Sequence, residues 1–166
     1  MAVKDSLLPE FDHEMGTTRR ILERVPQGDL AWKPHAKSFS LGQLASHIAN
    51  IPHWVDATFD HAIFDLATIG DDARPQQPTE VAPILAAFDA NVKNARAKIG
   101  EQLDQVFFTP WTLKKHGQEI FTMPKIVVWR SFIMNHLIHH RGQLSVYLRL
   151  RDVALPSIYG PTADEG

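Results

Sequence analysis

The sequence contains no cysteine. This absence excludes disulfide bonds, metal sites built from thiolates and a cysteine nucleophile. Long hydrophobic runs are also missing, since no stretch of about 18 apolar residues occurs and no membrane-spanning helix is predicted. The first residues lack the apolar run of a signal peptide. We therefore expect a soluble, cytoplasmic protein that has no contact with a membrane.

An excess of one charge is lacking as well. The chain has 17 basic and 19 acidic residues, which gives a net charge of −2 with neutral histidines. This balance provides no basic surface for nucleic acid, so we expect none as a partner. The 166 residues, 44% of them hydrophobic and 22% charged, have the composition of an ordinary globular protein. A single domain over residues 1–166 is expected, because domains commonly contain about 100–200 residues.

Apolar residues recur with a helical period in four segments of the chain. The first segment covers about residues 4–25. The second begins at Ser40, where Gln43 three residues later completes the pattern of a capping box. It continues to about Val55, and Pro52 inside it predicts a kink because proline removes a backbone donor.

The other two helical segments lie in the second half of the chain. The third begins near Thr79, after a polar connector at residues 70–80, and reaches about Ile99. The last begins at about Pro124, which is acceptable in a first helical turn, and ends at about Arg151. The tail that follows contains prolines and glycines and should be extended.

Residues 101–123, between the third and fourth segments, show no helical period. Their Phe, Thr, Trp and Gly content predicts an irregular excursion with a short hairpin near Gly117. Four amphipathic helices with almost no strand signal predict an all-α fold. We expect an up-down four-helix bundle with this excursion before its last helix.

Three of the nine histidines lie in "NHLIHHRGQL", residues 135–144. An α-helix advances about 100° per residue, so His136 lies about 40° from His140 on the helix surface. His139 lies about 100° away, toward the flank, and is expected at the surface or at an interface. His136 and His140 are therefore predicted to face inward together, on the apolar stripe that also carries Trp129, Ile133, Leu144 and Tyr147.

Two imidazoles at this spacing can bind one ion, since their Cβ atoms are about 5–6 Å apart and each nitrogen ligates zinc at about 2.0–2.1 Å. The candidate third ligand is His47, at the border of the apolar face of the second helix. A pair of core histidines that hydrogen-bond to their neighbours is the alternative interpretation, because buried imidazoles need partners in either case.

Several side chains are candidates to support these ligands or to line a pocket. Gln143 lies about 60° from His140, and the amide of Asn50 is the nearest candidate to His47 by helical spacing. Arg141 lies about 100° off the ligand face and is expected at an interface or in a salt bridge. No Asp or Glu is assigned as a general base. The full set of candidates is Asn50, Trp54, Gln143, Tyr147 and Tyr159, with Trp54 and Tyr147 also expected in the core.

Three segments, "FSLGQLASHIANIPHW", "NHLIHHRGQLSVYLRL" and "LPSIYGPTADE", together resemble the DinB superfamily of four-helix-bundle metalloproteins. The resemblance covers essentially the whole chain, and the last helix and tail carry most of its specificity. It implies that His47, His136 and His140 are the metal ligands. It also implies a divalent zinc or nickel ion and a homodimer. The superfamily includes thiol S-transferases and a thiol-dependent isomerase.

Three histidine ligands leave part of the coordination sphere open, which is typical of catalytic sites and not of closed structural zinc sites. An open position can activate a water or bind a thiol as thiolate. We therefore expect a metal-dependent enzyme, a thiol S-transferase or a small-molecule hydrolase, whose substrate is a small molecule such as a low-molecular-weight thiol. The alternatives are a non-catalytic metal-binding, stress-response protein whose ion stabilises the bundle, and a bundle that binds metal only adventitiously.

Overall fold

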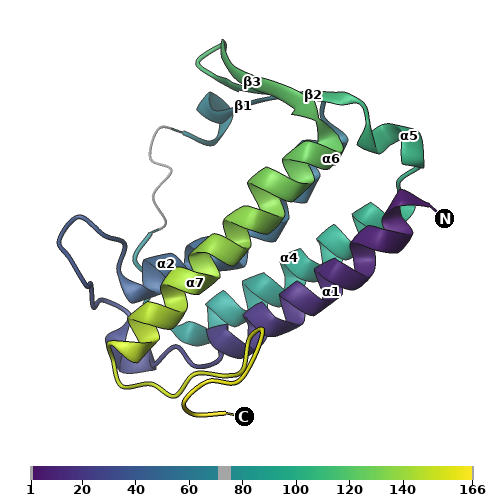
Figure 1. Cartoon of the computed structure of the whole chain (residues 1–166). Coiled ribbons are helices and arrows are strands. Elements are labelled where there is room, and N and C mark those ends of the chain that lie inside the picture. Colours follow the sequence, from purple (N-terminus) through teal and green to yellow (C-terminus); the bar gives the residue numbers. More distant parts are fainter. Residues whose placement is uncertain (1, 71–75, 166) are drawn as a thin grey trace.

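Four helical segments lie side by side and enclose an apolar core (Figure 1). The structure, a computed structural model, describes residues 2–70 and 76–165. Residues 71–75 of the predicted connector lie outside the described residues. The helices of the four segments are α1 Val3–Leu22, α2 Leu41–Asn50 with α3 Trp54–Asp60, α4 Val81–Glu101, and α6 Lys125–Val128 with α7 Asn135–Arg149.

Ser40 and Pro52 shape the second segment as predicted. The hydroxyl of Ser40 accepts a hydrogen bond from the backbone N–H of Gln43 at 3.1 Å, and the backbone N–H of Ser40 donates to the Gln43 side chain at 3.0 Å. This reciprocal pair starts α2. At Pro52 the helix is interrupted by a 3-10 turn, Ile51–His53, before α3 begins. On both sides of this break the segment packs against α4, since α2 and α3 each contact that helix.

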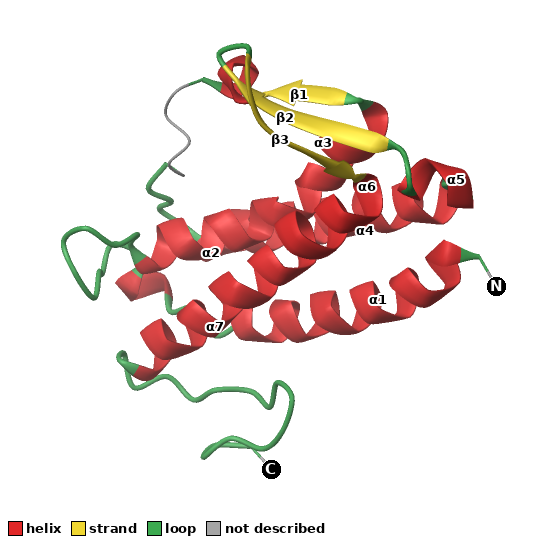
Figure 2. Cartoon of the chain, turned by 45° about the horizontal axis from the view of Figure 1, so that its top comes forward, coloured by secondary structure: helices red, strands yellow, loops and turns green. Residues whose placement is uncertain are grey.

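A small three-stranded sheet lies at one end of the bundle (Figure 2). The predicted all-α bundle is therefore confirmed only as a mostly helical fold. Two strands, β2 Pro110–Lys115 and β3 Gln118–Pro124, are antiparallel and follow the short helix α5 Asp104–Phe107. The third strand, β1 Ile63–Asp65, pairs in parallel with β2. Its three residues are too few to show an alternating pattern, and its partner lies far away in the sequence.

The hairpin predicted near Gly117 is confirmed. His116 and Gly117 form its two-residue turn with φ angles of 49° and 77°, in the left-handed region that such turns require. The carboxylate of Asp65, at the end of β1, accepts hydrogen bonds from the backbone N–H groups of His116 at 3.0 Å and of Gly117 at 2.7 Å. These bonds attach β1 to the hairpin. The pKa of Asp65 is lowered first by the hydrogen bond that its carboxylate accepts from the backbone N–H of Ala67 at 2.9 Å, and then by the bonds from the hairpin turn.

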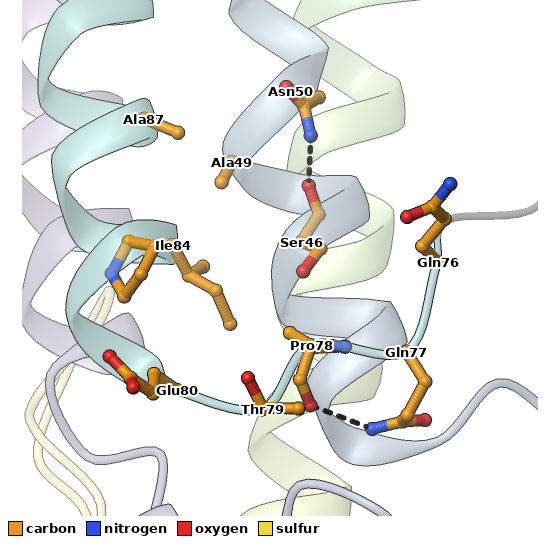
Figure 3. A pocket seen from close by; sticks show the side chains of 11 residues that line it. Ser46, Ala49, Asn50, Gln76, Gln77, Pro78, Thr79, Glu80, Ile84 and Ala87 are labelled. Atoms are coloured by element: carbon orange, nitrogen blue, oxygen red, sulfur yellow. Dashed lines mark hydrogen bonds between the residues drawn. The ribbon is translucent and has the colours of Figure 1, made fainter.

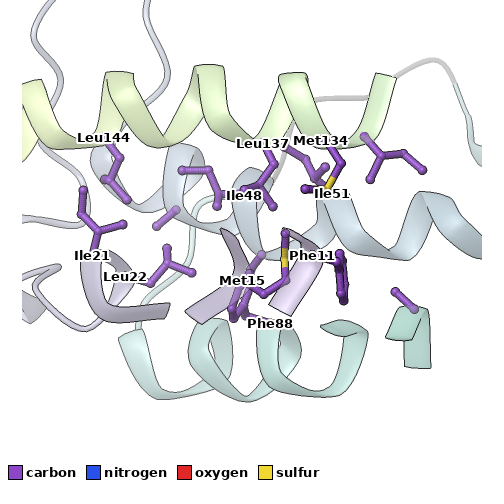
Figure 4. Packing of buried hydrophobic residues seen from close by; sticks show 14 of the residues in the cluster. Phe11, Met15, Ile21, Leu22, Ile48, Ile51, Phe88, Met134, Leu137 and Leu144 are labelled. Atoms are coloured by element: carbon purple, nitrogen blue, oxygen red, sulfur yellow. The ribbon is translucent and has the colours of Figure 1, made fainter. Parts of the chain in front are cut away.

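Two apolar clusters fill the molecule. The larger lies between the four helical segments and contains the side chains shown in Figure 4, among them Phe11, Met15, Ile48, Phe88 and Leu144. The smaller lies under the sheet and is built on the buried residues Trp111, Leu113 and Val128. Partly buried aromatic residues, Trp54, Phe64, Phe121 and Phe132, pack against this second cluster.

The last helical segment is not one regular α-helix. A π-helical stretch, Trp129–Met134, separates α6 from α7. Such wide turns are rare and often occur at functional sites, and this one ends two residues before His136.

Two further 3-10 turns are Gln27–Asp29 and Leu66–Ile69. No described helix combines the length and the apolar character that crossing a bilayer requires.

The C-terminal tail, up to residue 165, contains no helix or strand, as predicted. Its acidic end is attached to the bundle by ion pairs. Glu165 contacts Arg24 of the segment after α1 at 2.5 Å, and Asp164 contacts Arg149 of α7. The tail therefore folds back along the bundle.

Candidate metal centre

Three imidazoles from two helices meet between α2 and α7. His47 comes from α2, and His136 and His140 come from consecutive turns of α7. The ring centroid of His47 lies 5.0 Å from that of His136 and 4.5 Å from that of His140, and the centroids of His136 and His140 are 4.7 Å apart. One ring nitrogen from each residue lies within 4.8 Å of the other two.

The closest approach in this group is between Nε2 of His47 and Nε2 of His136, at 3.2 Å. Two nitrogens that share a tetrahedral zinc ion at about 2.0–2.1 Å each are about 3.3 Å apart. The two rings are therefore already spaced as ligands of one ion. His136 also has a buried Nδ1 atom that finds no well-aligned hydrogen-bond partner within residues 2–70 and 76–165.

The surroundings keep these imidazoles neutral. Burial, and then the proximity of His140 and His136, lowers the pKa of His47 from 6.5 to about 4. Burial is also the largest cause that lowers the pKa of His136 and the pKa of His140. A neutral imidazole carries the lone pair that a metal ion needs. At neutral pH the three rings are therefore ready to bind a cation without first losing a proton.

Gln143 supports the orientation of the His140 ring from outside. The side-chain oxygen of Gln143 lies 2.7 Å from Nδ1 of His140. When that oxygen accepts a hydrogen bond from Nδ1–H, the lone pair is on Nε2, at the other side of the ring. The backbone carbonyl of Phe132, one turn before His136, partly opposes the lowering of the pKa of His136. Among the side chains predicted to support the ligands, Gln143 forms a hydrogen bond with one of the three histidines.

The structure places Asn50 elsewhere. Its amide nitrogen donates to the backbone carbonyl of Ser46 at 2.8 Å, and its amide oxygen lies 3.5 Å from the side-chain nitrogen of Asn91 on α4. Asn50 therefore belongs to the side of α2 that faces α4. The helical spacing placed it near His47 but did not reveal these competing partners.

The hydroxyls of the two candidate tyrosines bind residues other than the three histidines. The Tyr147 hydroxyl is 3.4 Å from the carbonyl of Phe39, and its ring packs edge-on against Trp32. This is the core position that was expected as the alternative. The hydroxyl of Tyr159 instead contacts Glu14 and Arg141. Arg141 is in a buried salt bridge with Glu14, one of the two roles predicted for it.

Aromatic rings flank the three histidines on two sides. The ring of Phe39 lies 5.8 Å from His47, and the ring of Phe132 lies 5.9 Å from His136. Trp54 packs edge-on against Phe132 at 5.1 Å. Neither Phe132 nor Phe39 is among the site residues predicted from the sequence. Phe132 is one turn before His136, so helical spacing could have indicated it, whereas Phe39 lies in a loop with no such signal.

Two surface hollows near α2 and α7 differ in their relation to these rings. One, of 590 Å³, lies between α2 and α4 and is lined by Ser46, Ala49 and Asn50 together with residues before and within α4 (Figure 3). None of the three histidines lines it. The other, of 340 Å³, is lined by His136 and by the exposed His139, which lies at the surface as predicted.

A helical bundle that brings three neutral histidines together from two of its segments defines a class of proteins whose histidine cluster is compatible with metal binding. The DinB family profile matches residues 1–166, and the chain belongs to the DinB family. The resemblance seen in the sequence is thereby confirmed. The match extends over the whole length of the chain, so the histidines, the sheet and the tail all lie inside it.

Known relatives agree with this assignment. The chain is 25% identical to the uncharacterized protein YrdA of Bacillus subtilis (strain 168) over 163 residues, which are 97% of this chain and 90% of that protein. Its fold is similar to that of a DinB-like protein from Bacillus cereus ATCC 10987, with a TM-score of 0.70, 21% identity and coverage of 93% and 97% of the two chains. A DinB-like protein of Bacillus subtilis, YjoA, gives a TM-score of 0.70 at 17% identity, covering 93% and 99%.

Proposed function

We propose that the protein binds one divalent transition-metal ion through His47, His136 and His140 and uses it to act on a small molecule. The observation that carries this proposal is the meeting of three neutral imidazoles, one nitrogen from each within 4.8 Å of the others. Imidazole suits zinc and nickel, and these are the ions we propose. Three protein ligands leave at least one position of a tetrahedral ion to a substrate.

The ion, when bound, supplies Lewis-acid chemistry that promotes loss of a proton from a water or a thiol. The chain supplies the rest. Burial keeps the imidazoles neutral, and Gln143 holds the His140 ring in the tautomer whose Nε2 lone pair is available. The rings of Phe39 and Phe132 shield two sides of the group from water. These residues bind and orient, and they do not transfer protons.

Within this proposal, a thiol S-transferase is favoured over a small-molecule hydrolase. The described group consists of histidines alone and includes no carboxylate that could relay the protons of a hydrolysis. A thiol would require less, because an ion held by these histidines would lower its pKa, its proton would pass to solvent, and the thiolate would itself be the nucleophile. Because the chain contains no cysteine, that thiol must arrive as a second substrate of low molecular weight.

A metal assay followed by an activity screen tests the proposal. Untagged protein is analysed for its metal content and then incubated with small thiols and electrophiles, and with ester and amide substrates. We expect one bound ion per chain and turnover that His136→Ala abolishes. The matched control is His139→Ala, which changes an exposed neighbour on the same helix and should retain both metal and turnover. Sub-stoichiometric metal in the unmodified protein would contradict the proposal and indicate adventitious binding.

A second candidate is a non-catalytic metal-binding protein, for instance one linked to stress, in which the ion stabilises the bundle. The 3.2 Å approach of the two Nε2 atoms favours it, since an ion there connects α2 to α7. This candidate predicts that metal raises the melting temperature while the whole substrate panel gives no turnover. Two further expectations stay proposals, a cytoplasmic location and a homodimer, and sedimentation of the purified chain tests the second.

A further inference from the structure

A third hollow, of 410 Å³, lies beside α3 and β1. Its volume is within the range of about 300–1,000 Å³ that small-molecule sites occupy. Four of its lining side chains are apolar, and two of them are aromatic rings packed edge-on at 5.4 Å, Trp54 and Phe64. Ala57 and Ile69 complete the apolar wall. The mechanism proposed above does not use this hollow.

The hollow continues the edge of the helix that carries His47. Trp54 and Ala57 follow His47 at intervals of seven and ten residues, which places all three on one side of the α2–α3 segment. With a rise of about 1.5 Å per α-helical residue and about 2.0 Å per residue of the intervening 3-10 turn, Trp54 lies about 12 Å along the axis from His47. The ring of Phe132 connects Trp54 to His136. Its centroid lies 5.1 Å from that of Trp54 and 5.9 Å from that of His136.

The charges around the hollow are already paired. The carboxylate of Asp56, the one acidic group among the described lining residues, accepts two hydrogen bonds from Asn94 at 2.9 and 2.8 Å. It also lies 3.1 Å from the ammonium of Lys98 and 3.2 Å from a ring nitrogen of His53. The hollow therefore presents no unpaired carboxylate to a cation. The aromatic wall favours a flat, uncharged ligand instead.

We propose that this hollow binds the uncharged, aromatic part of the substrate whose reactive end lies at the three histidines. The proposal rests on the function proposed above for those histidines. It assigns Trp54, Phe64 and Ile69 as residues that determine specificity, and it predicts that the preferred substrates are elongated. Such a molecule has a thiol or electrophilic group at one end and an aromatic ring at the other, separated by the width of the Phe132 ring.

The first experiment tests the hollow without any metal. Indole, an uncharged bicyclic probe, is titrated into the metal-free full-length protein, and NMR follows the indole N–H signal of Trp54, identified by its loss in Trp54→Phe. We expect a saturable shift of that signal. Ile69→Ala removes part of the apolar wall and should weaken binding by about threefold to tenfold. Benzenesulfonate, a charged aromatic probe, should bind more weakly than indole.

The controls use matched positions. Ile69 and Ile120 are similarly exposed, at 54% and 51%, and Ile120 lies on β3 outside the hollow, so Ile120→Ala should leave indole binding unchanged. Ala57→Leu fills the hollow from α3 and should weaken binding by about tenfold or more. The same change at the exposed Ala90 of α4 is its control. Ile69→Ala and Ala57→Leu each have their own control, so the test remains valid if one of these two variants fails to fold.

The second experiment connects the hollow to the histidines. Cobalt-loaded protein is titrated with phenylalkane thiols of increasing chain length and with mercaptoethanol, and the thiolate-to-cobalt absorption band is followed. We expect a chain length at which binding is tightest, and Ala57→Leu should remove that preference while mercaptoethanol binding stays unchanged.

The two experiments separate the two proposals. Indole that binds without moving the Trp54 signal, or that binds equally well to Ala57→Leu, overturns the assignment of the hollow whatever the metal does. Indole binding with the expected variant effects, combined with no thiolate band for any thiol, supports the hollow and overturns the thiol function. A thiolate band of equal strength for every chain length, with no effect of Ala57→Leu, overturns the connection between them.

Discussion

Glu14 and Arg141 form an ion pair inside the bundle, with 2.7 Å between Oε2 and Nη1 and side chains that are 8% and 1% exposed. The hydroxyl of Tyr159 donates to the Glu14 carboxylate at 2.9 Å and accepts a hydrogen bond from Arg141. The same guanidinium contacts the Thr18 hydroxyl at 3.2 Å. The cluster thus joins α1, α7 and the C-terminal tail, and Arg141 directly follows the ligand candidate His140.

Glu14→Gln should destabilise the protein strongly. The amide keeps the size of the side chain but leaves the buried guanidinium of Arg141 without a counter-charge, and breaking a buried pair in this way costs about 3–5 kcal/mol. Urea denaturation measures the free energy of unfolding. The control is Glu10→Gln, because Glu10 pairs with Arg130 at the surface, where such pairs contribute about 1 kcal/mol or less. An equal loss of unfolding free energy in Glu14→Gln and Glu10→Gln would show that the buried pair contributes no more to stability than the surface pair.

Tyr159→Phe should have a smaller effect, confined to the tail. The ring keeps its contact with the guanidinium of Arg141, centred 5.0 Å away, while the hydroxyl between Arg141 and Glu14 is lost. A lost hydrogen bond to a charged group corresponds to about 1.5–3 kcal/mol. Hydrogen exchange should show faster exchange after Leu155 and unchanged protection in α4. Unchanged protection of the tail in Tyr159→Phe would mean that the ion pairs of Asp164 and Glu165 alone attach the tail to the bundle.

The metal-free protein should lose stability as the pH falls from about 6.5 toward about 4, the interval between the ordinary pKa of His47 and its pKa in the folded state. The pKa of His47 is lowered by folding, so in this interval the unfolded chain binds more protons and stability decreases with decreasing pH. His136 and His140, whose pKa values are lowered too, act in the same direction. Melting temperatures measured across this interval with a chelator present test the sign.

His47→Gln is the comparison for that titration, because it removes the imidazole whose pKa is lowered to about 4 and keeps a polar side chain. The variant should show a weaker dependence of melting temperature on pH between these limits. If the melting temperature of His47→Gln depends on pH as strongly as that of the unmodified protein, other groups cause the loss of stability in acid.

Gln143→Leu should weaken metal binding without unfolding the protein. Gln143 is exposed, and its oxygen, 2.7 Å from Nδ1 of His140, fixes the tautomer of that ring. Loss of such an outer contact typically lowers metal affinity by about 10–100-fold. Competition with a coloured chelator measures the affinity. Gln105→Leu, at an exposed position on α5, should leave it unchanged, and equal affinity in both variants would contradict the role of Gln143.

The parts of the site that could be predicted from the sequence depend on local spacing. His136 and His140 are one helical turn apart, and the capping box at Ser40 fixes where α2 begins, so the faces of both helices follow from the sequence. The break at Pro52 follows from the missing backbone donor. In each case the physical cause lies within a few residues of its effect.

The parts that could not be predicted depend on distant partners. β1 is three residues long, and it is a strand only because β2 and the turn at Gly117 lie beside it. Asn50 lies on the edge that carries His47, but its amide is engaged by Ser46 and Asn91. Glu14 is an acidic residue inside α1, and nothing local indicates that Arg141, in the last helix, neutralises it.

Metal removal provides the most direct test of the three-histidine group. If the ion binds only the folded chain, it adds about 2.7 kcal/mol of stability at a free concentration 100 times its dissociation constant. Zinc or nickel should therefore raise the melting temperature, and a chelator should reverse the rise. His136→Ala removes one of three ligands and should abolish the shift, whereas His139→Ala, on the adjacent exposed position, should retain it in full. A shift that survives in His136→Ala but disappears in His139→Ala would place the ion at the surface hollow beside α7 and not between the two helices.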